Sequence, residues 1–224
     1  MEDRKLKKNL PPKSKISYDV TSGLFFSELK EILNSDNVNK VVKFNLKTMR
    51  FNETKFPGAF IVEIEPHKDE RGFFARSFCQ KEFAQHGLKT EILQSNIAYN
   101  KTRGTIRGIH YQTAPHEEAK LVRCTKGALY DIIIDIREVS STYCQWEAFE
   151  LTETNNLMLY IPEGFAHGFQ TLQDDTTVFY QMFGWFHPES ARGVRWNDPT
   201  FKIEWPLPVS VISEKDKSYQ DFLL

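Results

Sequence analysis

The stretch Ile106-Arg-Gly-Ile-His-Tyr-Gln112, together with the later stretch Ile161-Pro-Glu-Gly-Phe-Ala-His-Gly-Phe169, decides the fold of this chain. Each stretch places one histidine among strand-forming residues, close to glycines that mark turns. Short apolar runs of this kind recur from Phe60 onward. They predict strands at residues 60–65, 91–98, 105–111, 119–125, 128–136, 146–152, 157–161 and 177–183. Many short strands at this spacing indicate an all-β sandwich or barrel.

The remainder of the chain divides into an N-terminal appendage and a few short helices. Residues 1–16 are basic and poor in apolar side chains, which is typical of a tail. Residues 22–34 space their apolar side chains near 3.6 positions, which predicts a short amphipathic helix with Ser22 as its N-cap. Further helices are expected at 73–86 and 215–222. We therefore divide the chain into residues 1–50, a tail with a short helical appendage, and residues 51–224, the barrel domain.

The composition limits the classes of function and of partner. With 40% hydrophobic residues, 26% charged residues and a net charge of −1, nothing in it favours nucleic acid or a membrane surface as partner. No apolar run approaches the ~20 residues that span a bilayer, and no signal-peptide core follows the charged N-terminus. The three scattered cysteines, Cys79, Cys124 and Cys144, fit free thiols in a reducing cytoplasm.

The two histidine stretches resemble the two halves of the cupin β-barrel signature. This resemblance implies a double-stranded β-helix, or jelly roll, with His110 and His167 pointing into the barrel. A metal-binding cupin carries His-x-His in its first half, whereas here the second of these positions is Gln112. Two imidazoles without a third ligand or thiolates make a poor cage for a divalent metal, but they suit proton transfer near neutral pH. We therefore expect no metal and no other cofactor.

Several further motifs resemble, in order and spacing, the dTDP-4-dehydrorhamnose 3,5-epimerase family of deoxysugar biosynthesis. The resemblance extends over roughly residues 56–217, and its motifs outside the two histidine stretches are Asp69–Phe74, Gln94–Asn96, Lys120–Gly127, Tyr130-Asp131, Asp135–Arg137, Arg192–Pro199 and Ile203–Pro206. It implies an isomerase of deoxysugar and surface polysaccharide biosynthesis. Such an enzyme epimerises C3 and/or C5 of a nucleotide-linked 4-keto-6-deoxy sugar through an enolate. This chemistry needs a base on one face of the sugar, a cation or donor for the oxyanion, and an acid on the opposite face.

The resemblance also implies a catalytic set. His110 matches the base, Tyr180 the acid, and Lys120 the residue near the C4 oxygen and the phosphates, while Asp216 matches the carboxylate that orients the base. Asp135 is the competing carboxylate. From the residues alone, structural roles stay open for these positions, namely a core histidine, a core tyrosine and a surface lysine.

The expected contacts to the nucleotide sugar involve a larger set, which comprises Arg71, Phe74, Gln94, Asn96, Arg107 and His167. Arginine suits bidentate contact with pyrophosphate, and a phenyl ring can stack on a pyrimidine base. Strand alternation would place Arg107 and His110 on opposite faces, so we expect a β-bulge at Gly108. The resemblance further implies a homodimer with strand exchange, in which Arg71 and Gln94 would serve the partner's site.

Two positions depart from the family pattern, and other functions remain open. Arg76 stands where many members carry a glutamate, which bears on the accepted nucleotide, and Phe186 replaces a tyrosine, which bears on whether one or two carbons react. The alternatives are a metal-dependent cupin oxygenase or isomerase, a sugar-nucleotide 3,4-ketoisomerase, and a non-catalytic sugar-nucleotide binder. The sequence names neither the nucleotide nor the sugar.

Overall fold

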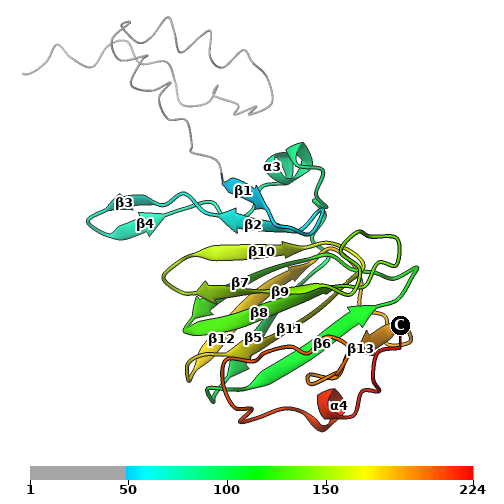
Figure 1. Ribbon diagram of the computed structural model, residues 1–224. Coiled ribbons are helices and arrows are strands. Elements are labelled where there is room, and N and C mark those ends of the chain that lie inside the picture. The colour runs from blue at the N-terminus through cyan, green and yellow to red at the C-terminus, as the bar shows by residue number, and fades with distance from the viewer. Residues whose placement is uncertain (1–48, 224) are drawn as a thin grey trace, which may run out of the picture. The chain divides into compact units, whose positions relative to one another are not determined.

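The computed structural model describes residues 49–223, and the tail, the helix expected at 22–34 and most of the proposed 1–50 segment lie outside these residues. The described part folds into two main sheets and a small hairpin (Figure 1). The larger sheet has the strand order β1 (Arg50–Glu53), β2 (Phe60–Glu63), β10 (Leu157–Ile161), β7 (Lys120–Lys126), β12 (Thr176–Met182), β5 (Gln94–Asn100). The second sheet has the order β13 (Ala191–Gly193), β6 (Ile106–Gln112), β11 (Phe165–Thr171), β8 (Ala128–Asp135), β9 (Trp146–Thr152).

The two sheets are antiparallel and enclose the central core. Alternate residues of β7 and β12, such as Val122 and Val178, pack from the larger sheet against Leu129, Ile133 and Phe169 of the second sheet. All of these side chains are at most 5% exposed. This arrangement confirms the all-β jelly-roll prediction, and it follows from the period of two that each strand carries.

The outer face of the second sheet is covered by the C-terminal part of the chain. Ile132 and Ile134 of β8 pack there with Val194 and Phe201. Strand β8 is therefore buried on both faces, which explains why its sequence is an almost continuous apolar run.

The expected helices are shorter in the structure than in the sequence analysis. Residues 72–74 form β4 (Gly72–Phe74), which pairs with β3 (His67–Asp69), so the helix predicted at 73–86 is wrong over its first half. Only α3 (Gln80–Gln85) remains of it, because Cys79 at its N-cap has extended backbone. Near the C-terminus, α4 (Glu214–Lys217) begins at Ser213, whose side chain accepts a hydrogen bond from the Asp216 backbone N–H.

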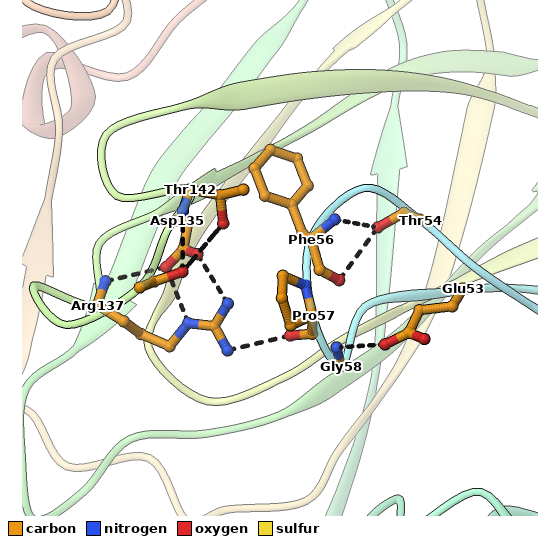
Figure 2. Close-up of polar contacts among 9 residues, drawn as sticks. Glu53, Thr54, Phe56, Pro57, Gly58, Asp135, Arg137 and Thr142 are labelled. Atoms are coloured by element: carbon orange, nitrogen blue, oxygen red, sulfur yellow. Dashed lines mark hydrogen bonds and ion pairs between the residues drawn. The ribbon is translucent and has the colours of Figure 1, made fainter.

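Asp135 is a structural carboxylate. Its prediction as the alternative carboxylate partner of His110 is wrong, because His110 pairs with Asp216. The buried oxygens of Asp135 accept hydrogen bonds from the Arg137 guanidinium (2.7 and 2.9 Å) and from the hydroxyls of Ser140 and Thr142 (both 2.6 Å). Arg137 also donates to the carbonyl of Pro57 at 3.1 Å. This contact, drawn in Figure 2, joins the end of β8 to the loop between β1 and β2. Burial alone would raise the pKa of Asp135, but these hydrogen bonds outweigh it and lower the pKa to about 2.

Substituting Asp135→Asn should lower the free energy of unfolding by about 3 kcal/mol at pH 7, because it removes the charge from a buried, hydrogen-bonded pair. A depressed pKa in the folded state means that the carboxylate stabilises the fold above pH 4 and that this contribution is lost as the pH falls toward 2. Urea denaturation of both proteins between pH 7 and pH 3 should show the difference shrinking as the pH falls. A difference that stays constant over this range would contradict the assignment, and Ser140→Ala, which removes one neutral donor, is the matched control.

Candidate active site

Two adjoining cavities lie between the sheets and share three of the predicted residues. The first has a volume of about 370 Å3 and the second about 590 Å3. His110, Lys120 and Tyr180 line both of them. His110 lies on β6 of one sheet, whereas Lys120 and Tyr180 lie on β7 and β12 of the other. A molecule bound here would therefore meet the imidazole from one sheet and the ammonium and phenol from the other.

His110 forms a pair with a buried carboxylate from the end of the chain. Its Nε2 lies 2.7 Å from Oδ1 of Asp216, and Oδ2 of the same carboxylate accepts from the backbone N–H of Gly108 at 3.3 Å. Burial raises the pKa of Asp216, but the hydrogen bond and charge of His110 outweigh it and leave the pKa below its ordinary value. Asp216 is thus ionised at neutral pH and accepts the proton of Nε2, so that Nδ1 of a neutral His110 keeps its lone pair.

The expected bulge on β6 is present and brings Arg107 to the same side of the strand as His110. His167 of β11 pairs with His110 of β6, and Phe169 pairs with Arg107. The two partners are two residues apart on β11 but three residues apart on β6, so β6 contains one extra residue. Gly108 has a φ of +101°, and a Cβ there would lie 2.7 Å from the carbonyl of His167, so a side chain does not fit. Both Arg107 and His110 line the second cavity. Nε of Arg107 donates to Oδ1 of Asn100 at 2.6 Å, which anchors the guanidinium on β5.

His167 forms a second histidine–carboxylate pair, facing His110 in the register of β11 and β6. Its Nε2 lies 2.7 Å from Oδ1 of the fully buried Asp131 on β8. His167 is one of the predicted binding residues, whereas Asp131 had no predicted role. An aspartate in the otherwise apolar core of a strand was the available signal, because a buried carboxylate requires a partner.

Lys120 is held by an acidic neighbour, Glu118, that was not singled out from the sequence. Its Nζ lies 3.2 Å from Oε1 of Glu118, and both side chains are less than 10% exposed. Oε2 of Glu118 accepts from the Gln112 amide at 3.1 Å, and Glu118 lines the first cavity. For Tyr180, burial raises the pKa above its ordinary value; the charge of Arg107 opposes this and that of Glu118 adds to it.

Gln112 has a structural role at the position where metal-binding cupins have a ligand. Its side-chain nitrogen donates to the carbonyls of His116 (2.9 Å) and Trp185 (3.0 Å) and to Glu118, and its oxygen accepts from the N–H of His187 at 2.6 Å. The amide is therefore fully engaged in holding the loops at the end of the barrel.

Of the six predicted binding residues, four line the cavities of their own chain and two do not. Gln94 and Asn96 line the first cavity, and Arg107 and His167 the second. Arg71 and Phe74 lie on the β3–β4 hairpin, outside both cavity walls, with the Arg71 side chain 90% exposed and paired to Asp69, and Phe74 71% exposed.

The two departures from the family pattern are placed differently. Phe186 lines the first cavity, and its backbone N–H donates to Gln94 at 3.0 Å. Arg76 is outside both cavity walls and pairs with Glu82 of α3 at 2.7 Å. The cavity walls also contain residues that the sequence analysis did not single out, namely Tyr111, Glu118, Arg192, Lys215 and Tyr219.

A jelly roll with an imidazole–carboxylate pair facing a phenol defines a cupin-type barrel equipped for acid–base chemistry. Comparison with known proteins gives the family: the model described as dTDP-4-dehydrorhamnose 3,5-epimerase matches residues 53–223, and the chain belongs to this family. It is therefore an isomerase of the epimerase class that acts on a nucleotide-linked sugar. This result supports the epimerase reading over the metal-dependent, ketoisomerase and non-catalytic alternatives.

Individual relatives agree with this assignment. The chain is 40% identical over 176 residues to dTDP-4-dehydrorhamnose 3,5-epimerase of Shigella flexneri, which covers 78% of this chain and 97% of the relative. The enzyme of Bacillus anthracis, solved with TDP and PPi bound, superposes with a TM-score of 0.76 at 36% identity, covering 78% of this chain and all of that one. The Legionella pneumophila enzyme, solved with dTDP-4-keto-L-rhamnose, superposes with a TM-score of 0.73 at 34% identity, covering 78% of this chain and 93% of that one.

Among the described residues, no helix has the length and apolarity to cross a bilayer.

The contact between His110 and Asp216 predicts the tautomer of the imidazole. In 15N-resolved NMR spectra at neutral pH, neutral His110 should carry its proton on Nε2, and Asp216→Ala should remove this preference because the acceptor is lost. Asp131→Ala is the matched control, since it should alter His167 and leave His110 unchanged. A His110 spectrum that is the same in Asp216→Ala as in wild type would contradict the pairing.

Proposed function

We propose that this chain epimerises both C3 and C5 of a dTDP-linked 4-keto-6-deoxyhexose, with His110 as base and Tyr180 as acid. The observation that carries the proposal is the origin of these groups on facing sheets around the shared cavities. A sugar ring between the sheets presents one face to the imidazole and the other to the phenol. Inversion of a carbon needs this arrangement, because the proton leaves from one face and another returns to the opposite face.

The steps use only side chains of the cavity. His110, oriented by Asp216, removes the proton from the carbon beside the C4 ketone, and the electron pair moves onto the carbonyl oxygen to form the enolate. The Lys120 ammonium stabilises this oxyanion, and losing one such donor typically costs ~3–4 kcal/mol. Tyr180, kept protonated by burial, then donates its proton to the opposite face. Solvent returns a proton to Tyr180 and removes one from His110.

Polar and cationic residues that line the two cavities would bind the nucleotide. Gln94 and Asn96 offer amide groups in the first cavity, and Arg107 and His167 line the second, where Arg107 can contact phosphate. The TDP and dTDP-sugar ligands of the relatives from B. anthracis and L. pneumophila support thymidine as the base. We assign Arg71 and Phe74 to the partner's site in a homodimer, because both are exposed on a hairpin away from the cavities of their own chain.

The cellular setting follows from the same assignment. We place the enzyme in the cytoplasm, where nucleotide sugars are made, and the three free cysteines are consistent with a reducing compartment. We also propose that the chain divides into residues 1–50, a tail with a short helical appendage, and residues 51–224, the barrel domain.

Proton exchange in deuterated water tests the reaction. With dTDP-4-keto-6-deoxyglucose, wild type should place deuterium at C3 and C5 and form the epimerised product. His110→Asn should reduce both exchange and product by 10²- to 10⁴-fold, the usual loss for a general base. His86→Asn is the matched control, because His86 stacks on Phe51 outside the cavities. Exchange at C3 alone would restrict the reaction to one carbon, and exchange that survives in His110→Asn would overturn the role of the base.

Mixing of variants tests the shared site. If Arg71 acts in the partner's site, a mixed dimer of Arg71→Ala and His110→Asn chains contains one site with both defects and one intact site. Refolding the two inactive variants together should then restore about half of the wild-type activity to each mixed dimer. If Arg71 and His110 act in the same site, every site has a defect and the mixture stays inactive. Arg76→Ala is the control variant, because Arg76 pairs with Glu82 on α3 and lines neither cavity.

A further inference from the structure

Outside both cavities, two histidines and a glutamate converge at the end of the barrel. The ligand atoms of His116, His187 and Glu189 all lie within 4.8 Å of one another. The two imidazole rings are stacked with their centroids 3.6 Å apart, and Nδ1 of His187 lies 3.1 Å from Oε1 of Glu189. We propose that these three side chains bind a divalent ion of the zinc class, in contrast to the expectation of no metal, which was argued from His110 and His167 alone.

The backbone beneath this His116–His187–Glu189 cluster is already fixed. The buried amide of Gln112 donates to the carbonyl of His116 at 2.9 Å and accepts from the N–H of His187 at 2.6 Å. It thereby holds together the loop after β6 and the loop after β12. Within the second loop, the N–H of Ser190 donates to the carbonyl of His187 at 3.0 Å. Between the loops, the N–H of Thr113 donates to the carbonyl of Ser190, also at 3.0 Å. Binding an ion therefore requires ordering of three side-chain tips and not of two loops.

The donor set suits zinc and its neighbours among the divalent metals. Two imidazoles and one carboxylate are a known zinc ligand set that leaves the fourth position to water. Imidazole nitrogen favours zinc, copper and nickel over magnesium and calcium, which prefer oxygen. Arg192, the neighbouring cation, donates to the backbone carbonyl of Glu189 and not to its carboxylate, so the carboxylate contacts only His187 among these groups.

A modest movement of the side chains completes the geometry. Ligands at ~2.0–2.1 Å from a tetrahedral ion lie about 3.4 Å apart, so the present spread must contract. The Glu189 side chain is 67% exposed and free to approach. A metal ion lies in the plane of each imidazole, so binding opens the ring stack and replaces it with two metal–nitrogen bonds. Both loops would then be joined at the rim of the first cavity, next to Phe186.

Titration of the full-length, metal-free protein with ZnCl2 tests this proposal. Calorimetry should detect one tight site per chain in wild type, and the melting temperature should rise with zinc. The double variant His116→Asn/His187→Asn and the single variant Glu189→Gln should bind at least 10- to 100-fold more weakly, which is the loss caused by removing even an outer-shell partner. His67→Asn, which alters an exposed histidine of β3, should bind like wild type.

Two results would overturn the proposal. One is a wild-type protein that binds no zinc up to millimolar concentration. The other is zinc binding that survives in the double variant and is lost in His110→Asn/His167→Asn, which would place the ion inside the barrel. These variants and His86→Asn together cover all six histidines of the chain. Circular dichroism of each variant establishes that it is folded, so loss of binding reports on the ligands.

Discussion

The buried carboxylate of Asp216 joins the last segment of the chain to the strand that carries His110. One of its oxygens contacts the imidazole, and the other accepts the backbone N–H of Gly108 at the bulge. The bulge in turn places Arg107 beside His110, and a glycine is required there because the backbone of β11 leaves no room for a side chain. The same carboxylate therefore links the orientation of the His110 imidazole, the backbone of β6 at the bulge and the docking of α4.

The jelly roll places the His110–Asp216 pair opposite the side chains of the other sheet. Because the two sheets face each other, His110 of β6 and Tyr180 of β12 line the cavities from opposite sheets. In the proposed reaction, they therefore act as base and acid on opposite faces of the sugar ring. Lys120, held by Glu118, places a cation on the same sheet as Tyr180. Each group stands on a strand of a packed core, and sites on rigid elements hold their geometry more closely than sites on loops.

Much of this arrangement could be predicted from the sequence. Strand positions follow from the period-two alternation, and the motif context placed His110, Lys120, Tyr180 and Asp216 in one site. Local patterns failed where tertiary contacts decide: residues 73–79 have helical spacing but begin with a hairpin strand. The partners Asp131 and Glu118 could not be identified, because pairing across strands depends on a register that the sequence does not state. Arg71 and Phe74 were predicted from the motifs as binding residues, and they lie on the β3–β4 hairpin, outside the cavities of their own chain.

The central claim is that base and acid act from opposite faces, and Tyr180→Phe tests it most directly. In deuterated water with dTDP-4-keto-6-deoxyglucose, His110 of this variant still removes a proton and returns a deuteron to the same face. The recovered substrate should therefore contain deuterium without inversion, while epimerised product falls by 10²- to 10⁴-fold. Tyr143→Phe, outside both cavities, should behave like wild type. Inverted product at the wild-type rate, or loss of exchange together with inversion, would contradict the account.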